Sequence, residues 1–522
     1  MTRCFTILEV SQKQNYIFAS NKLKDNIVNS AVIAYVLGAD YIKEVLQDTS
    51  YSEAKNMVYS GGGHTILVFD DEDTAREMVS ILTQKIYCEF DGLMVFAKSE
   101  LFDENTPIQE CLKRLTESLE RKKSVRLASF HQGSYGIEKV DANTLDVIAE
   151  NSVSETKKKV ERLEYDSTAK KYVPAGYRPA YQFEDLGGAK NDSNFIAVVH
   201  IDGNGMGKRV EELYEIIGGK SWEDTKKELK KFSDGIDNDF KKAYKEMTEE
   251  VARNLQEAGL DQKLSLRDNY FPVRRVITAG DDICFVAEGR IGMECARIFI
   301  EKLGKKENEV DKKHYSACAG VAIVHQKYPF YRAYELAEML CSNAKKYGAK
   351  ISPADNGRSV SAIDWHIEFG ELKDSLKEIR QTYVTADQNR LELRPYIVSA
   401  PEEIMSKEEY SVRLYENFKR IIHRVQNNGE TYGNGKLKEL RGALKKGETA
   451  TRNYLVFNQM EDILVENRPG HEKITEVDLM QLFSGKEIKG VAFVPQEDGK
   501  KHSILYDSIE LMDSFIALEG GE

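Results

Sequence analysis

The 522-residue sequence has no long hydrophobic run and no cysteine pattern typical of a metal site or a disulfide framework. No apolar stretch approaches the roughly 20 residues that span a bilayer, and the start, Met1 to Leu8, lacks the apolar core of a signal peptide. The 7 cysteines include no C-x-x-C pair, and several lie inside apolar runs, as Cys284 does. These absences predict a cytoplasmic protein with buried, reduced thiols.

The chain also lacks an excess of positive charge. Its 74 Lys and Arg stand against 86 Asp and Glu, and the net charge is −12, so any contact with nucleic acid must come from local basic patches. The sequence contains no H-E-x-x-H motif and no His-Asp doublet. A hydrolytic metal centre of those types is therefore unsupported.

The segment from residue 195 to residue 363 alternates between predicted strands and helices. A buried strand, Phe195–Ile201, ends at Asp202-Gly203-Asn204-Gly205, and a charged, largely helical stretch follows. A hairpin then turns through Ala279-Gly280-Asp281-Asp282. Another helix leads to the strand Ser316–Ile323, which is followed by the helix Ala333–Lys346. This order predicts a palm-type domain of helices packed on a sheet.

The first part of the chain repeats the same order in compressed form, from the strand Phe5–Val10 to a hairpin with the turn Gly61–His64. Aligning the two hairpins and the two opening strands sets three pairs of residues opposite one another: Gly63 and Asp281, His64 and Asp282, and Ser11 and Asp202. The repeat predicts an internal duplication. Only its second half is expected to keep acidic residues at these three points.

These patterns divide the chain into four parts. Residues 1–130 form a first, degenerate palm-like domain, and the polar segment 131–190, with its Pro and Gly residues, is a linker or small insertion. Residues 191–366 form the second palm, and the charged, helix-favouring segment 367–522 forms an α-helical C-terminal domain. The predicted fold class is α+β, with two ferredoxin-like palm domains in tandem followed by helices.

The strongest candidate site consists of Asp202, Asp281 and Asp282. A strand end and a turn on an adjacent strand bring carboxylates within a few Å of one cation, and such hard oxygen ligands suit Mg²⁺ or Mn²⁺. Two such ions about 4 Å apart polarise an attacking hydroxyl and stabilise a leaving pyrophosphate. A Gly-Asp-Asp sequence is also typical of an ordinary turn. The apolar flanking strands and the acid at the end of the first strand favour the metal site.

Further residues are candidates for binding a nucleotide. The loop after Asp202 opens a helix, and its three glycines let backbone N–H groups approach phosphates closely, although Arg209 follows where a Walker A motif requires Ser or Thr. A lysine near the end of a helix can reach a phosphate or simply complement the helix dipole. The nucleotide-binding candidates are Gly203, Asn204, Gly205, Gly207, Lys208, Gly280, Lys345 and, for a base or ribose contact, Ser316.

The segment Phe195–Lys208, with its I-D-G-N-G-M-G-K core, and A-G-D-D at 279–282 resemble the large polymerase/cyclase subunit of type III CRISPR effector complexes. The first half resembles the first palm of that subunit, in Q-N-Y-I-F at 14–18 and S-G-G-G-H at 60–64. The resemblance implies two palms face to face and conversion of ATP into cyclic oligoadenylates or related adenylate signals. It also implies that Asp202, Asp281 and Asp282 are the catalytic metal ligands.

The chain departs from that family in ways that limit the expectation. Ala279 stands where the family has the first glycine of G-G-D-D, and no HD nuclease domain precedes the first palm, so cleavage of single-stranded DNA is not expected. The expected partners are ATP, a CRISPR RNA–protein complex or target RNA, with a homodimer as an alternative. A non-catalytic nucleotide-binding scaffold is the second hypothesis. A diguanylate cyclase is disfavoured because Ile283 and Cys284 follow Asp282.

Overall fold

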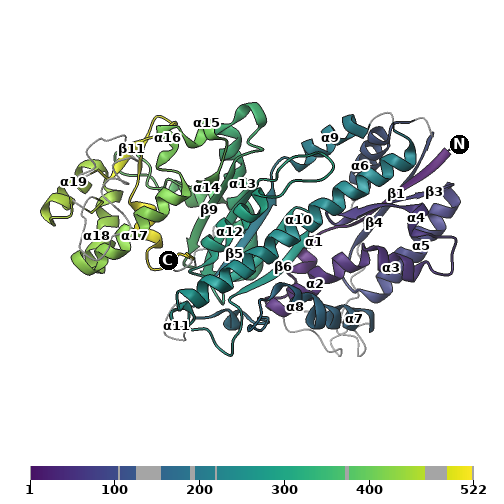
Figure 1. Ribbon diagram of the computed structural model, residues 1–522, viewed down its shortest axis with the longest axis horizontal. Coiled ribbons are helices and arrows are strands. Elements are labelled where there is room, and N and C mark those ends of the chain that lie inside the picture. Colours follow the sequence, from purple (N-terminus) through teal and green to yellow (C-terminus); the bar gives the residue numbers. More distant parts are fainter. Residues whose placement is uncertain are drawn as a thin grey trace.

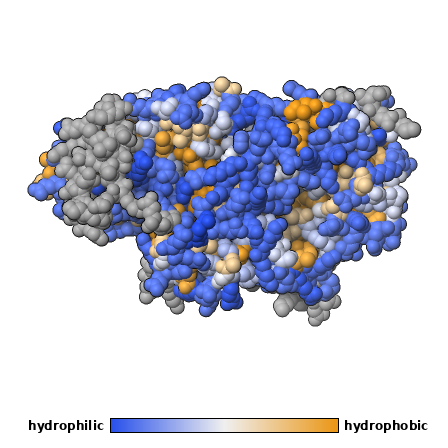
Figure 2. All heavy atoms as spheres, viewed as in Figure 1, coloured by the Kyte–Doolittle hydropathy of each residue, from blue (hydrophilic) through white to orange (hydrophobic). Residues whose placement is uncertain are grey.

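The computed structural model describes residues 2–103, 106–124, 155–188, 194–217, 220–370, 375–461, 463–464 and 491–519. These residues form two palm domains and a C-terminal region, which lies at one end of the elongated molecule (Figure 1). Across these ranges, no helix is both long and apolar enough to cross a membrane. The face drawn in Figure 2 is largely hydrophilic, and its hydrophobic residues gather in small patches.

The first palm is a four-stranded antiparallel sheet in the order β2-β3-β1-β4. The central strands β1 and β3 are almost fully buried, as their apolar sequences require. The strands are β1 (Thr2–Val10), β2 (Met57–Gly61), β3 (His64–Phe69) and β4 (Val95–Asp103). The helices are α1 (Lys13–Ile17), α2 (Leu23–Val36), α3 (Ala39–Val45), α4 (Glu53–Asn56), α5 (Glu72–Glu89) and α6 (Ile108–Ser124).

The second palm has a six-stranded sheet in the order β10-β9-β8-β5-β7-β6. All neighbouring strands are antiparallel except β8 and β9, which run parallel and are joined by α13. The strands are β5 (Phe195–Gly203), β6 (Val273–Ala279), β7 (Asp282–Glu288), β8 (Ala317–His325), β9 (Ser361–Glu368) and β10 (Tyr396–Ser399). The helices are α9 (Met206–Ile217), α10 (Trp222–Glu257), α11 (Leu260–Lys263), α12 (Gly292–Gly304) and α13 (Phe330–Ile351).

The two sheets repeat one another, as the duplication predicts. The order β2-β3-β1-β4 matches β6-β7-β5-β8, and both hairpins carry an irregularity at the same place, between Met57 and Tyr59 in one and between Arg275 and Ile277 in the other. The opening strands β1 and β5 each have 9 residues. Predicted tandem palms of the ferredoxin-like type are therefore confirmed.

The strand register corrects one of the aligned pairs. Glu9 pairs with His64 in the first palm, as Asp202 pairs with Asp282 in the second. Glu9, and not Ser11, is therefore the counterpart of Asp202, and the prediction that the first half keeps no acid at these points is wrong. The error arose because sequence alone does not show where β1 ends, and Ser11 lies just beyond that end.

The segment between the palms, predicted as a linker or small insertion over 131–190, has a helical part. Its described helices are α7 (Glu155–Leu163), a π-helix (Glu164–Thr168) and α8 (Ala169–Tyr172). Glu164 is buried and accepts hydrogen bonds from Arg274 (3.2 Å) and Arg275 (3.1 Å) of β6. The segments 125–154 and 189–193 lie outside the described residues.

The C-terminal region is mainly helical, as predicted. It also contains a small two-stranded sheet. The helices are α14 (Leu376–Gln381), α15 (Glu402–Met405), α16 (Glu408–Ser411), α17 (Tyr415–Tyr432), α18 (Asn434–Lys445), α19 (Glu448–Phe457) and α21 (Tyr506–Leu511), and the strands are β11 (Phe493–Pro495) and β12 (Lys501–Ser503).

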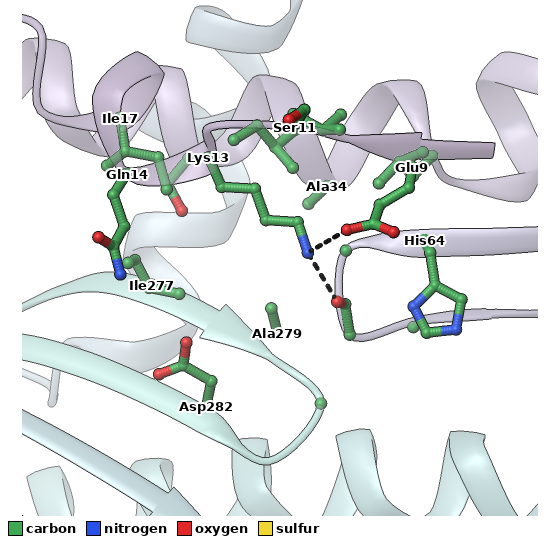
Figure 3. Close-up of a pocket in the computed structure, with 18 of the residues that line it drawn as sticks. Glu9, Ser11, Lys13, Gln14, Ile17, Ala34, His64, Ile277, Ala279 and Asp282 are labelled. Atoms are coloured by element: carbon green, nitrogen blue, oxygen red, sulfur yellow. Dashed lines mark hydrogen bonds and ion pairs between the residues drawn. The ribbon is translucent and has the colours of Figure 1, made fainter. Parts of the chain in front are cut away.

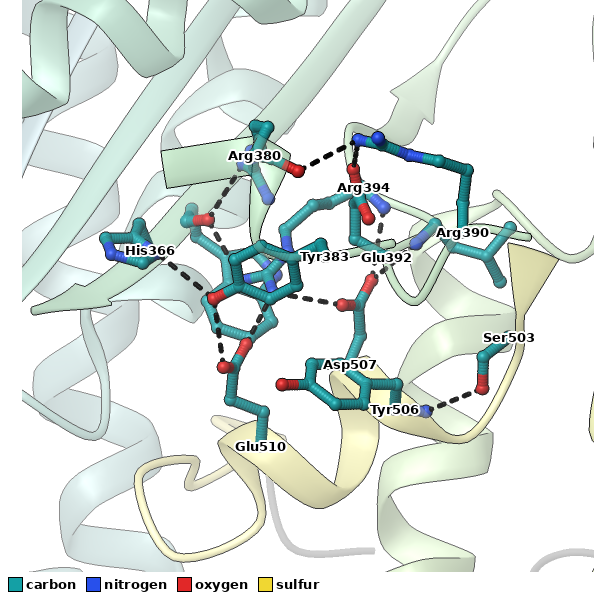
Figure 4. Close-up of polar contacts among 12 residues, drawn as sticks. His366, Arg380, Tyr383, Arg390, Glu392, Arg394, Ser503, Tyr506, Asp507 and Glu510 are labelled. Carbon is teal, nitrogen blue, oxygen red and sulfur yellow. Dashed lines mark hydrogen bonds and ion pairs between the residues drawn. The ribbon is translucent and has the colours of Figure 1, made fainter. Parts of the chain in front are cut away.

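A buried polar network joins this region to the second palm (Figure 4). The guanidinium of Arg394 lies 3.7 Å from the ring centre of Trp365 on β9 and pairs with Asp507 (3.2 Å) and Glu510 of α21. Tyr383 also donates to Glu510 (3.0 Å). The end of the chain is thereby fixed to the sheet that carries Asp202.

Candidate active site between the two palms

The tips of the two palm hairpins meet. Gly280 has a φ of +64°, and a Cβ built on it would lie 3.6 Å from the backbone nitrogen of Gly62. A cavity of about 710 Å³ opens beside this contact. It is lined by the β2–β3 turn and α1 from the first palm and by the β6–β7 turn and α13 from the second. Ligand sites in proteins are typically of about this size.

Three aspartates lie close together where the neighbouring strands β5 and β7 of the second sheet meet the β6–β7 turn. Asp202 is the last residue but one of β5 and is the register partner of Asp282, which begins β7. The backbone of Asp281 accepts a hydrogen bond from Gly203 N (3.2 Å), so the turn is tied to the end of β5. Asp281 and Asp282 line the cavity, whereas Asp202 does not. The structure thus brings together the three residues that the sequence singles out.

Burial and the repulsion between neighbouring carboxylates raise the pKa values of the two aspartates in the β6–β7 turn. Burial, and then the charge of Asp202, raises the pKa of Asp281 from 3.8 to about 6 and that of Asp282 to about 7. His200 Nδ1 lies 3.4 Å from Asp282 Oδ1, but burial lowers the pKa of His200, so this contact is not an ion pair at neutral pH. The three aspartates therefore repel one another, and the surrounding protein groups neutralise their negative charge only in part.

Replacing Asp282 by asparagine should stabilise the metal-free protein. Its pKa of about 7 means that the folded chain keeps a proton that the unfolded chain releases near 3.8, so ionisation costs stability as the pH rises between these values. We expect a gain of about 1–2 kcal/mol at pH 8, less than the full shift implies because solvent screens this partly exposed carboxylate. Urea denaturation in EDTA at pH 8 and pH 4 measures it; an equal gain at both pH values would contradict the assignment.

Lys345 of α13 neutralises Asp202. Its Nζ lies 2.5 Å from Asp202 Oδ2 and donates to the carbonyl oxygen of Gly203 at 2.8 Å. Two hard oxygen atoms therefore already converge on one cationic group. The prediction that Lys345 belongs to the site agrees with this position, and its contact with a phosphate stays a prediction.

The donor set fits a divalent cation in part. Asp282 Oδ1 is buried without a hydrogen-bond partner, and the ammonium group on Asp202 and Gly203 marks a position that a cation favours. Within the described ranges, however, no three His, Cys, Asp or Glu side chains form a group that could hold a metal ion. Mg²⁺ commonly uses only one or two carboxylates and takes its other ligands from water and phosphate. The aspartates match that mode of binding.

The predicted phosphate loop is held mainly by structural contacts. Asn204 is buried and donates through Nδ2 to the carbonyl of Val360 (2.7 Å) and to Ser316 Oγ (3.2 Å). Ser316 in turn donates to the carbonyl of Arg358. Gly205 has a φ of +66°, and its missing Cβ leaves room for the Arg358 side chain. Ser316 therefore serves to hold the loop, and nothing directs its hydroxyl into the cavity.

Of the predicted nucleotide-binding residues, only Gly280 lines the cavity. Gly203 packs against Asp281, and a Cβ on it would lie 3.0 Å from the Cβ of that aspartate. Gly207 and Lys208 are exposed in the first turn of α9, which begins at Met206, directly after the loop that the sequence predicts to open a helix.

The sequence motifs of the first palm include Gln14 and His64, but sequence reasoning assigned no role to the residues at the contact between the two palms. Gln14 of α1 donates to Glu338 of α13 at 3.1 Å, and Lys13 projects into the cavity (Figure 3). Tyr59 and His64 hydrogen-bond to each other at 2.8 Å beside the turn of the first palm. Burial lowers the pKa of His64, so a neutral imidazole occupies the position equivalent to Asp282. Because the two palms repeat the same order of elements, positions in the first palm that match the acidic turn of the second could have been singled out from the sequence.

Fold and site together define a tandem-palm protein with an acidic hairpin at the palm–palm interface. Residues 195–352 match the family model of Cas10/Cmr2, second palm domain. The second palm is thus a Cas10/Cmr2-type palm, and the resemblance predicted from the sequence is confirmed. Comparison with curated protein sequences gives no match.

Solved structures of Csm1, alone and with Csm4, are similar to this chain, and one with a TM-score above 0.5 supports the fold. The structure of Csm1 from T. onnurineus has a TM-score of 0.51 and 17% identity and covers 98% of this chain and 70% of that one. The Csm1–Csm4 cassette in complex with cA4 has a TM-score of 0.49 and 16% identity, with 98% and 69% covered. The cassette in complex with AMPPNP has a TM-score of 0.49 and 16% identity, with 97% and 70% covered.

Proposed function

We propose that this chain is a metal-dependent nucleotidyltransferase that joins ATP molecules into a cyclic oligoadenylate or a related adenylate messenger, with release of pyrophosphate. The observation that carries the proposal is the position of Asp281 and Asp282. They line a cavity between the two palms, and Asp282 Oδ1 is buried without a hydrogen bond from any described residue. The match of residues 195–352 to a Cas10/Cmr2 palm supports the same function.

The chain's own residues account for binding and charge control. Asp202 and Asp282 would hold Mg²⁺ or Mn²⁺, which when bound polarises the attacking 3′-hydroxyl and neutralises phosphate charge. When a nucleotide enters, the Lys345 ammonium group would move from Asp202 to a phosphate oxygen. Asp202 would then be free to bind the metal ion. The N-terminus of α9 adds a favourable field for phosphate on this side of the site. The first palm forms the opposite wall of the cavity.

The alternative is a nucleotide-binding scaffold without turnover. The ion pair between Lys345 and Asp202, and the absence of any three-ligand metal group among the described residues, favour it. We also propose that the chain acts in an RNA-guided antiviral effector complex, since Cas10/Cmr2 palms belong to such complexes. CRISPR RNA and target RNA are the proposed partners, and a homodimer is the alternative.

Incubation of the full chain with radiolabelled ATP and Mg²⁺ or Mn²⁺ tests the two readings. The cyclase hypothesis predicts pyrophosphate release and oligoadenylate products by mass spectrometry, and the products should disappear in EDTA. Parallel reactions with GTP, CTP and UTP establish base choice. Binding of ATP with no product, both with and without a candidate target RNA, would favour the scaffold.

A further inference from the structure

Each palm carries an acid at the end of its first strand and a lysine on the helix after its fourth strand. Lys123 Nζ lies 3.1 Å from Glu9, as Lys345 Nζ lies 2.5 Å from Asp202. Both lysines occupy the same position in their helices, counted from the first residues of α6 and α13 (108 to 123 and 330 to 345). The acid–lysine pair is therefore duplicated with the fold, and the first palm keeps it.

The palms differ at the tips of their hairpins. Gly63 stands at the position of Asp281, and a Cβ built on Gly63 would lie 2.2 Å from Nζ and 2.5 Å from Cε of Lys13. The lysine side chain thus fills the space that a side chain at this position would need. An ammonium group in the first palm takes the place of a carboxylate in the second.

Lys13 is held at the cavity by neighbours that leave it accessible. Its Nζ donates to the carbonyl oxygen of Gly62 at 3.0 Å and lies 3.9 Å from Glu9, and its side chain is 34% exposed (Figure 3). Asp282 lies on the opposite wall of the same cavity. The ammonium group is therefore fixed by backbone geometry and still open to a ligand.

The two walls of the cavity carry opposite charge. On the first palm, two lysines (Lys13 and Lys123) line the cavity against one acid, Glu9. The second-palm lining instead holds four acids against one lysine, Lys241; the acids are Asp237, Asp281, Asp282 and Glu338. A phosphate next to the aspartates is repelled unless a cation lies between them. A phosphate next to Lys13 needs no such cation, because a lysine ammonium binds it directly.

We propose that Lys13 is a positioning residue, which binds the phosphate groups of a second nucleotide directly and replaces a metal ion in the first palm. This inference rests on the proposed function, because it assumes that nucleotides fill the cavity. It assigns any divalent cation to the second palm alone. Lys123 assists by holding Glu9, so that Glu9 does not draw the Lys13 ammonium away from the ligand.

Nucleotide counting on the full chain tests this role without turnover. The probe is an ATP analogue with a methylene group between the α and β phosphorus atoms, measured by equilibrium dialysis with Mn²⁺. The wild-type chain should bind two analogues. Lys13→Met should weaken one of them by about tenfold or more, the effect of losing a charge-assisted hydrogen bond, and leave the other unchanged. Lys13→Arg should restore the second analogue.

Two controls separate positioning from structural support. Lys85→Met removes an exposed lysine that pairs with Glu89 (3.0 Å) elsewhere in the first palm, and it should bind two analogues. Mn²⁺ binding without nucleotide, followed by electron paramagnetic resonance, should be unchanged in Lys13→Met and weakened in Asp281→Asn/Asp282→Asn. Thermal melting checks that each variant folds.

The outcomes distinguish failure of this inference from failure of the proposed function. If Lys13→Met binds two analogues as tightly as the wild type, or if Lys13→Arg fails to restore the second one, the inference is overturned and the cyclase function stands. If Lys13→Met gains or loses bound Mn²⁺, the ammonium does not act in place of a metal. If the wild-type chain binds no analogue, the proposed function fails and the inference with it.

Discussion

Replacing Asp281 and Asp282 together by asparagine is expected to lower product formation from ATP at least about a thousandfold. The substitutions keep the shape of the turn and remove the two carboxylates that line the cavity. Without them, Asp202 is left of the three predicted ligands, and Lys345 already neutralises it at 2.5 Å. The measurement is the initial rate of pyrophosphate release under saturating ATP and Mn²⁺, compared with the wild-type chain.

A matched double substitution controls for loss of negative charge. Asp70 and Asp73 lie on the exposed segment after β3, with side chains 73% and 94% exposed, and Asp70→Asn/Asp73→Asn makes the same change of net charge away from the cavity. This variant should retain the wild-type rate. A wild-type rate for the Asp281→Asn/Asp282→Asn variant would show that these residues are not needed for catalysis.

Replacing Asp507 by alanine is expected to lower the free energy of unfolding by about 3–5 kcal/mol. The carboxylate accepts hydrogen bonds from the backbone N–H groups of Leu393 (2.9 Å) and Arg394 (3.1 Å) and from the hydroxyl of Tyr396 (2.7 Å). It also pairs with the buried Arg394 guanidinium at 3.2 Å. Removing it leaves two N–H groups and a positive charge buried with fewer partners.

Urea denaturation of the full chain measures this loss, and Asp513→Ala is the matched control. Asp513 is close in sequence and pairs with Lys438 at 2.8 Å, but both side chains are 56% exposed. Exposed pairs of this kind contribute about 0–1 kcal/mol. A loss at Asp507 no larger than at Asp513 would show that the network in Figure 4 contributes little to holding the tail on the second palm.

The sequence was sufficient for the tandem palms and for the acidic hairpin, because both depend on local signals. Apolar runs that end in a turn define β5, β6 and β7, and Asp202, Asp281 and Asp282 stand where those runs end. The duplication follows from the repeated order of elements. The helical C-terminal region follows from its charged, periodic sequence.

The rest of the site depends on pairings between residues far apart in the chain. Glu9 becomes the counterpart of Asp202 only once its register with His64 is known, and no local pattern fixes that register. The roles of Lys13 and Glu338 depend on how the two palms pack on each other. Ser316 illustrates the converse, since the sequence suggested a base or ribose contact, but its hydroxyl donates to the backbone carbonyl of Arg358.

The long helix α10 has a mechanical consequence. At 1.5 Å per residue its 36 residues form a rod of about 54 Å. Trp222 at its start contacts Phe5 of the first palm (ring centres 5.1 Å apart), Ser233 supports Gly61 next to the hairpin tip, and Asn254 near its end donates to the carbonyl of Leu518 in the tail (3.0 Å). The first palm, the cavity and the C-terminal tail are therefore all in contact with one helix, so a displacement of α10 would disturb contacts in all three.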